Sequence, residues 1–160
     1  MSIKKISSLL IILSFFIYSC GFTPQYAGFK NLKFDLVLDE FSGDRDLNNE
    51  INSQIRRYDR GRSNIIKVKV SYNSKYEKIT LSRDTKGEAT KYKLKVNIDF
   101  EIDFEDYTKK FFFNDEFNIE RINDRIEENN YIKIVKRNFA ERAIERLILS
   151  INQENDNKVF

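Results

Sequence analysis

The sequence predicts an α+β protein, a two-layer α/β sandwich in which two helices lie on one face of a four-stranded mixed sheet. Three observations lead to this fold class. Apolar and polar residues alternate without a break over residues 91–105, as in a long strand with one buried face. Three less regular alternating stretches flank it, and two segments have helical periodicity instead. Their order along the chain is β-α-β-β-β-α, which suits two packed layers.

The strand at residues 91–105 organises the rest of the chain. Its even positions are all apolar and its odd positions are all polar, with lysines at the start and carboxylates at the end. At about 3.3 Å per residue, the strand would be roughly 50 Å long. We expect helices to cover its apolar face only, which leaves a charged face open.

The first strand and the first helix precede it. Residues 32–38 alternate loosely and predict a short strand, which Ser42-Gly43-Asp44 brings to an end. Residues 46–58 predict a helix that is N-capped by Asp44 or Asp46 and stopped near Gly61, with an apolar stripe of Leu47, Ile51, Ile55 and Tyr58. Because another strand follows this helix, the right-handed crossover rule makes the first strand parallel to its sheet neighbour.

Four arginines gather where this helix ends, namely Arg56, Arg57, Arg60 and Arg62. Cations suit the C-terminal end of a helix dipole, and that role accounts for two of them. An anionic ligand is the alternative explanation for the others.

Residues 65–81 predict the second strand, but its pattern changes parity near the end. One face carries Ile66, Val68, Val70, Tyr72 and Tyr76, whereas Ile79 and Leu81 fall on the other. A one-residue bulge near Glu77-Lys78 would return them to the apolar face. A turn at residues 85–88, with Gly87 as its permissive residue, then pairs this strand antiparallel with residues 91–105. The register gives three pairs of opposite charge, Lys69 with Asp103, Lys67 with Glu105, and Glu77 with Lys95.

The last strand and the last helix complete the domain. A turn at residues 106–108 leads into a fourth strand with Phe111, Phe113, Phe117 and Ile119 on one face, interrupted by Asp115. Residues 121–130 are a polar connection, and residues 131–152 predict the second helix from an apolar stripe that runs from Ile132 to Ile151. Residues 153–160 form a polar tail.

The composition excludes several functions. The 160 residues include no histidine and one cysteine, which removes Ser-His-Asp and Cys-His catalysis, zinc sites built on those residues, and any disulfide within the chain. Without Lys4 and Lys5, which we expect to be removed, the 28 basic side chains become 26 against 25 acidic ones, a net charge of about +1. That balance gives no support to nucleic-acid binding. We expect no metal site and no catalytic residues.

Residues 1–19 have the pattern of a bacterial lipoprotein signal peptide. Lys4 and Lys5 begin it, an apolar run follows, and the run ends at Ser19-Cys20-Gly21. Ile17-Tyr18-Ser19-Cys20 resembles a lipobox, in which the cysteine receives the lipid. The alternatives are an uncleaved signal anchor, or an ordinary signal peptide with an unrelated cysteine. Since the one cysteine stands at the one plausible cleavage point, we favour lipidation of Cys20.

Lipidation defines the organisation of the chain. A diacylglycerol and an N-acyl chain on Cys20 exceed the two signals that stable anchoring requires, and we expect no other cofactor. We expect a lipidated tether at residues 20–30, a domain at residues 31–152 and the polar tail. Gly21 follows the cysteine where an aspartate favours retention in the inner membrane, so we expect the periplasmic side of the outer membrane.

Three motifs resemble a known family, the lipopolysaccharide-assembly lipoproteins called LptE, in their alphaproteobacterial form. Cys20-Gly21-Phe22-Thr23-Pro24 is similar to the start of the mature family sequence, with Gln25-Tyr26 near its Leu-Tyr. The turn at residues 86–92 resembles the family's Gly-x-Ala-x-x-Tyr hairpin, and residues 142–148 resemble its last helix. The element order also matches, so the resemblance covers nearly the whole chain.

The resemblance implies a protein that is not an enzyme. Proteins of this family sit inside a large outer-membrane β-barrel, the lipopolysaccharide translocon LptD, where they plug the lumen, assist assembly and contact lipopolysaccharide. The corresponding phosphate contacts would be the basic residues at one end of the hairpin, Arg83, Lys86, Lys91 and Lys93.

Two other functions stay open at this point. One is a periplasmic lipoprotein that scaffolds a different envelope complex. The other, ranked last, is a tethered hydrolase that uses Asp99, Glu101 and Asp103, which point to the same side of one strand.

Overall fold

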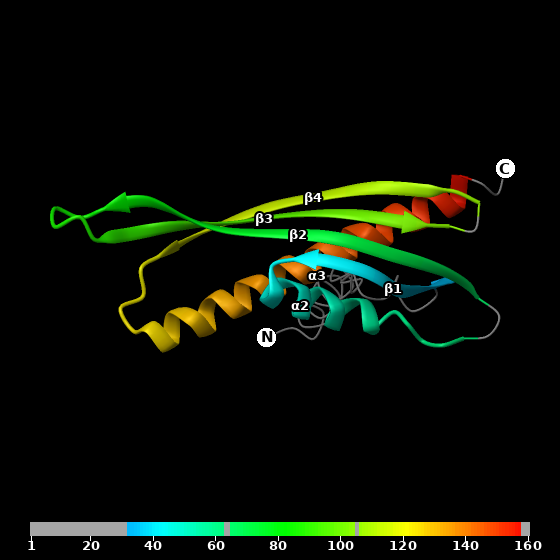
Figure 1. Ribbon diagram of the computed structural model, residues 1–160, viewed down its shortest axis with the longest axis horizontal. Coiled ribbons are helices and arrows are strands. Elements are labelled where there is room, and N and C mark those ends of the chain that lie inside the picture. The colour runs from blue at the N-terminus through cyan, green and yellow to red at the C-terminus, as the bar shows by residue number, and fades with distance from the viewer. Residues whose placement is uncertain (1–31, 63–64, 105, 158–160) are drawn as a thin grey trace, which may run out of the picture. The chain divides into compact units, whose positions relative to one another are not determined.

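The computed structural model describes residues 32–62, 65–104 and 106–157. Six elements follow one another along it, namely β1 (Phe34–Gly43), α2 (Arg45–Arg56), β2 (Ile66–Arg83), β3 (Ala89–Asp103), β4 (Thr108–Glu120) and α3 (Arg125–Asn157) (Figure 1). The predicted order β-α-β-β-β-α is confirmed. The predicted signal peptide, the predicted tether and Cys20 lie outside the described residues.

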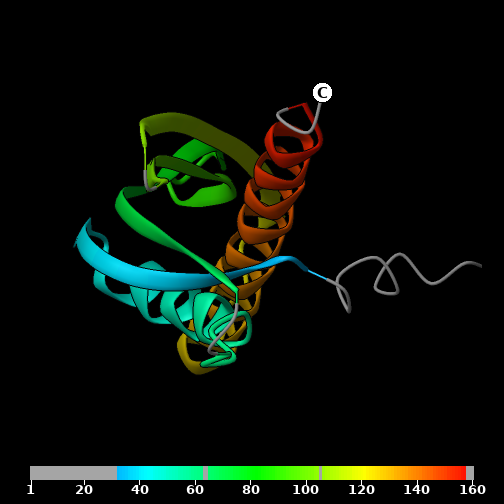
Figure 2. The same cartoon turned by 90° about the vertical axis from the view of Figure 1, so that its right-hand side faces the viewer.

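The four strands form one mixed sheet in the order β1-β2-β3-β4. β1 is parallel to β2, and the other two pairings are antiparallel. The helices α2 and α3 lie side by side on one face of this sheet (Figures 1 and 2). The predicted α+β fold, with a four-stranded mixed sheet and two helices on one face, is therefore confirmed.

The core lies between that face and the helices. Every even position of β3 from Leu94 to Ile102 is at most 1% exposed, as its alternation predicts. The apolar faces of the two helices pack against this face of the sheet. Their side chains are also at most 1% exposed, among them Leu47, Ile51, Ile55, Phe139, Ile144, Leu147 and Ile148. Full burial of such a side chain contributes about 1.5–3 kcal/mol, so this layer supplies most of the driving force for folding.

Gly43 fixes the passage from β1 into α2. β1 reaches Gly43 rather than Leu38, with a register shift between Leu38 and Phe41. Gly43 has φ of 105°, and a Cβ there would lie 1.8 Å from the carbonyl oxygen of Ser74. Only glycine fits this close approach. Asp44 then caps α2, as predicted, by accepting a hydrogen bond of 2.8 Å from Leu47 N.

The bounds of the last helix differ most from the prediction. α3 begins at Arg125 and reaches Asn157, instead of residues 131 and 152. Asp124 Oδ1 accepts hydrogen bonds from the backbone N–H groups of Ile126 and Glu127, at 2.7 and 3.0 Å. This cap starts the helix in a segment that buries no apolar stripe, where periodicity carries no signal.

The β2–β3 hairpin confirms the predicted turn but not the predicted bulge. Its strands end at Arg83 and begin again at Ala89, around Gly87 with φ of 82°. Pairing runs without a shift from Lys69 to Thr80, and the irregularities follow Thr80 instead of Glu77. The pairs Lys69–Asp103 and Glu77–Lys95 are confirmed as direct cross-strand neighbours, and the pair with Glu105 lies outside the described residues.

Candidate functional site

One face of the sheet carries no helix. We call it the open face, and it consists of the odd positions of β2 and β3 up to the hairpin and the even positions of β4, which lie opposite one another in the strand registers. Among the described residues, both helices pack against the other face (Figure 2). The open face is therefore the face of the sheet on which charged side chains of the strands stay accessible.

Ion pairs run across this face. Lys93 Nζ lies 2.9 Å from Glu116 Oε1, and Lys110 Nζ lies 4.0 Å from Glu101 Oε2, in both cases between β3 and β4. On β2, Lys75 and Glu77 are 2.9 Å apart. A hydrogen bond from Lys75, and then its charge, lower the pKa of the exposed Glu77 carboxyl. The face is thus a network of paired charges. On β3 the lysines lie nearer the hairpin and the carboxylates nearer the other end, which we call the acidic end, and β2 and β4 carry opposite charges at several of the facing positions.

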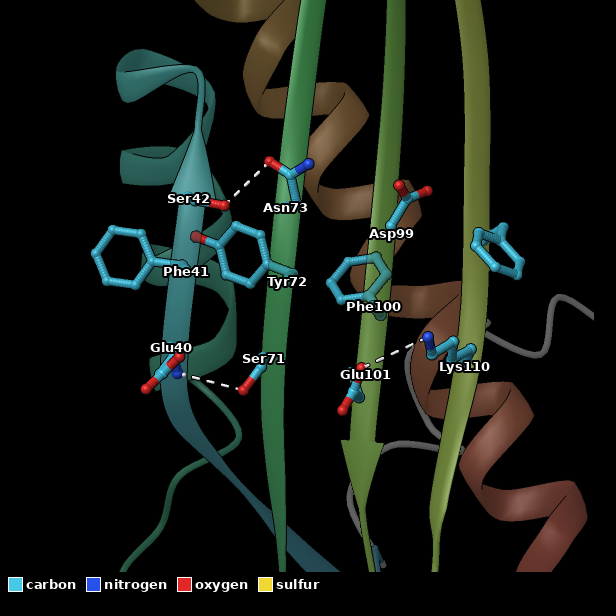
Figure 3. A pocket seen from close by; sticks show the side chains of 11 residues that line it. Glu40, Phe41, Ser42, Ser71, Tyr72, Asn73, Asp99, Phe100, Glu101 and Lys110 are labelled. Atoms are coloured by element: carbon cyan, nitrogen blue, oxygen red, sulfur yellow. Dashed lines mark hydrogen bonds and ion pairs between the residues drawn. The ribbon is translucent and has the colours of Figure 1, made fainter.

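A shallow hollow of about 400 Å³ lies at the acidic end of the open face (Figure 3). Ser42 Oγ donates to Asn73 Oδ1 at 3.1 Å, and Glu40 N donates to Ser71 Oγ at 3.4 Å along its wall. Phe112, from β4, also lines it and is 62% exposed. The hollow offers hydroxyl, amide and carboxylate groups beside aromatic rings, of which Phe41 and Phe112 are exposed.

The predicted carboxylate triplet lies at this acidic end. Glu101 faces Lys110, and Asp103 accepts a hydrogen bond from the Thr108 hydroxyl. Within the described ranges, no three Asp, Glu, Cys or His side chains form a group that could hold a metal ion.

The hairpin tip collects the predicted basic residues. Asp84 Oδ1 accepts from the backbone N–H groups of Lys86 and Glu88, at 2.9 and 2.8 Å, and fixes the turn. Arg83 donates from Nη1 to the carbonyl of Gly87 at 2.8 Å. Lys86 and Lys91 are exposed and form no ion pair with any described residue.

Lys93 differs from the other three because Glu116 neutralises it. The structure therefore brings Arg83, Lys86 and Lys91 to one tip with their charges available, and it places Lys93 further along β3 in a salt bridge. The salt bridge between Lys93 and Glu116 depends on the register of β3 with β4, which the β2–β3 hairpin does not determine.

Two exposed apolar residues lie on β2, before the strand reaches the tip. Ile79 pairs directly with Lys93 and so shares the open face, and it is 42% exposed. Leu81 follows at the irregularity and is 45% exposed. Their change of parity was visible in the sequence, but both side chains stay exposed, and the register shifts at Leu81 and not at Glu77-Lys78 as predicted. The hairpin thus carries cations at its tip and apolar surface further along β2.

One arginine of the cluster at the end of α2, Arg62, has a partner within the domain. Arg62 Nη2 lies 2.7 Å from Oδ1 of Asp35, whose side chain is only 1% exposed. Arg62 N also donates to Asp35 Oδ2 at 3.0 Å. Burial alone would raise the pKa of the Asp35 carboxyl, but the hydrogen bonds and the charge of Arg62 outweigh burial and lower it. The ion pair with Asp35 explains the position of Arg62 without an anionic ligand.

No helix in the described part of the chain has both the length and the apolar run that are needed to cross a membrane, and this includes α3.

Comparison with solved structures identifies the class of fold. The described body, a sheet covered on one side by two helices, is similar to lipoproteins of known structure. For the crystal structure of rare lipoprotein B from Shewanella oneidensis, the match has a TM-score of 0.55 at 13% identity and covers 76% of this chain and 100% of that one. A minor lipoprotein from Acinetobacter baumannii matches with a TM-score of 0.47 at 13% identity, over 69% of this chain and 93% of that one. No family model and no curated protein matches the sequence.

Proposed function

We propose that this chain is an outer-membrane lipoprotein, anchored through Cys20 on the periplasmic side, that plugs the β-barrel lipopolysaccharide translocon, assists its assembly and helps deliver lipopolysaccharide to the cell surface. Its role is that of a binding and assembly component without catalysis. The observation that carries this proposal is the one-sided sheet. A lipoprotein fold presents an uncovered face of paired charges, and the lumen of an outer-membrane barrel is polar.

The hairpin tip supports the contact with lipid. Lipopolysaccharide carries phosphates next to acyl chains, and the hairpin offers charged Arg83, Lys86 and Lys91 at its tip and exposed Ile79 and Leu81 further along β2. Lysine and arginine form charge-assisted hydrogen bonds to phosphate, and apolar side chains gain by leaving water against acyl chains.

Charge reversal at the tip tests this contact. The double variant Lys86→Glu/Lys91→Glu should retain at least about tenfold less lipopolysaccharide, because each cation that reverses its sign replaces attraction by repulsion. The matched control is Lys67→Glu/Lys133→Glu, which reverses two exposed lysines away from the tip and should retain as much as the wild type. Equal retention by the two double variants would contradict the role of the tip.

The anchor and the partner are tested separately. Cys20→Ala should release the protein from membranes, whereas continued tight association would favour an uncleaved helix. Purification of the lipidated chain should recover one large outer-membrane β-barrel protein. Recovery of a different envelope complex in its place would favour the scaffold function.

A further inference from the structure

β4 is an edge strand whose outer edge pairs with no other strand in the described part of the chain. It pairs with β3 through thirteen consecutive residue pairs without a register shift, and its other edge has no backbone partner there. The opposite edge differs, because β1 has a register shift after Leu38 and Leu36 N donates to Tyr58 O. Bulges and covering segments stop edge strands from pairing with other chains. β4 has neither of these and remains a ready template.

The charges of β4 make it complementary to itself. On the open face, Lys110 stands near its start, and Glu116 and Glu120 stand in its second half. Lys109 and Asp115 lie on the other face and pair with Glu154 and Arg142 of α3. In an antiparallel pair of identical strands, the basic half of one faces the acidic half of the other. We propose that the free chain forms a two-fold symmetric dimer in which β4 pairs antiparallel with β4 of a second copy and joins the two sheets. The inference concerns the free chain and does not rest on the proposed function.

The side chains select one register. Opposite residues of an antiparallel pair share a face, so the two open faces stay on the same side only when the two-fold axis passes midway between a residue and the same residue of the second copy. With the axis at Phe113, Lys110 lies opposite Glu116 of the second copy, and this contact occurs twice. The exposed Phe112 side chains then lie diagonally across the axis, a spacing that aromatic rings can span.

This register also continues the ion pairs of each copy. Glu116 already meets Lys93 and Lys110 already faces Glu101 within one sheet. Across the axis, the order becomes Lys93, Glu116, Lys110 and Glu101, so that charges of alternating sign run from one sheet into the next. Such an isologous contact closes on itself and limits assembly to a dimer.

A charge swap tests the pairing and its register together. Sedimentation velocity of the full chain in detergent should show a dimer for the wild type. Lys110→Glu and Glu116→Lys should each weaken dimerisation by at least about tenfold, because each places two pairs of like charges across the axis. An equimolar mixture of the two variants should dimerise again, since opposite charges then meet at both positions. Lys133→Glu, which changes an exposed lysine on α3, is the control and should stay dimeric.

Several results would overturn the proposal. They are a monomeric wild type, single variants that dimerise as well as the wild type, or a mixture of the two that stays monomeric while both give the far-ultraviolet circular dichroism of the folded protein. If either charge variant is unfolded, Phe112→Ser replaces them. This substitution alters an exposed side chain and should also yield a monomer, whereas a persistent dimer would place the interface elsewhere.

Discussion

The guanidinium of Arg62 donates two hydrogen bonds to the buried carboxylate of Asp35, from Nη2 and Nε to Oδ1 at 2.7 and 3.0 Å. The same Nη2 donates to the carbonyl of Phe34 at 3.2 Å. This contact ties the segment after α2 to the beginning of β1 and leaves Asp35 with no exposed surface. Removal of this contact should therefore lower the stability of the whole sheet.

Arg62→Leu should lower the free energy of unfolding by about 3 kcal/mol, because it leaves a buried carboxylate without its charged partner. Arg56→Leu is the matched control. Arg56 lies in the last turn of α2, where loss of a favourable dipole interaction costs at most about 1 kcal/mol. Urea unfolding at pH 7 measures both values. If both variants lose the same free energy of unfolding, the buried Asp35 carboxylate does not need Arg62 as its partner.

The same variant should change the pH dependence of stability. In the wild type, Arg62 holds the pKa of Asp35 below its ordinary value of 3.8, so the stabilisation is complete above that pH and is lost as the pH falls through the lower folded pKa. Without Arg62, burial should raise the folded pKa above the unfolded one. The deficit of Arg62→Leu should then shrink as the pH falls from 7 towards 4. A constant deficit in urea unfolding over this range would contradict the assignment.

Asp44 has two roles that substitution can separate. Its Oδ1 accepts from Leu47 N at 2.8 Å and from Lys136 Nζ at 2.9 Å, and the Lys136 side chain is only 7% exposed. Asp44→Asn should keep the helix cap and lose one of the two charge partners of Lys136, which also pairs with Asp46 at 3.4 Å, whereas Asp44→Ala loses the cap as well. Asp44→Ala should therefore be less stable than Asp44→Asn by about 1 kcal/mol in chemical denaturation. Identical stabilities would mean that the cap contributes nothing.

Two tyrosines of β2, the buried Tyr72 and the half-buried Tyr76, differ in whether their hydroxyl groups have a hydrogen-bond partner. Tyr72 OH donates to Asn52 Oδ1 at 2.7 Å, but Tyr76 OH has no hydrogen-bond partner among the described residues. Burial, with the charges of Asp44 and Glu128, raises the pKa of Tyr76 to about 12. Tyr72→Phe should cost about 1 kcal/mol, and Tyr76→Phe should be neutral or stabilising. Thermal unfolding of the two variants compares them directly, and a larger loss for Tyr76→Phe would contradict the assignment.

Two adjacent phenylalanines of β4 test which face of the sheet is buried. Phe113 is 1% exposed and Phe112 is 62% exposed. Phe113→Ala should lower the free energy of unfolding by about 3–5 kcal/mol, as expected for a large core side chain. Phe112→Ala should change it by less than about 0.5 kcal/mol when unfolding is measured at low protein concentration. Similar losses at both positions would show that the open face is covered in solution.

The sequence predicts the sheet well because a strand has only two faces. Strict alternation in β3 assigns every side chain to the core or to the open face, and the burial of Phe100 and Ile102 confirms it. The opposite-charge pairs Lys69–Asp103 and Glu77–Lys95 could be derived for the same reason, since the turn around Gly87 fixes their register.

Other features required tertiary information. The first turns of α3 rest on the Asp124 cap and not on burial, so periodicity alone places the start of the helix too late. The predicted bulge assumed that Ile79 and Leu81 must be buried, yet apolar residues often remain exposed. The salt bridge of Lys93 with Glu116 depends on the β3–β4 register, so the sequence identified the basic tip without showing which lysines stay unpaired.

Site-specific photocrosslinking in living cells tests the central proposal most directly. The crosslinking residue replaces Asn97, which lies on the open face between β2 and β4. The account predicts one prominent adduct with a large outer-membrane β-barrel protein. If the open face meets only water or a different envelope protein, no barrel adduct will form, and that result would contradict the account.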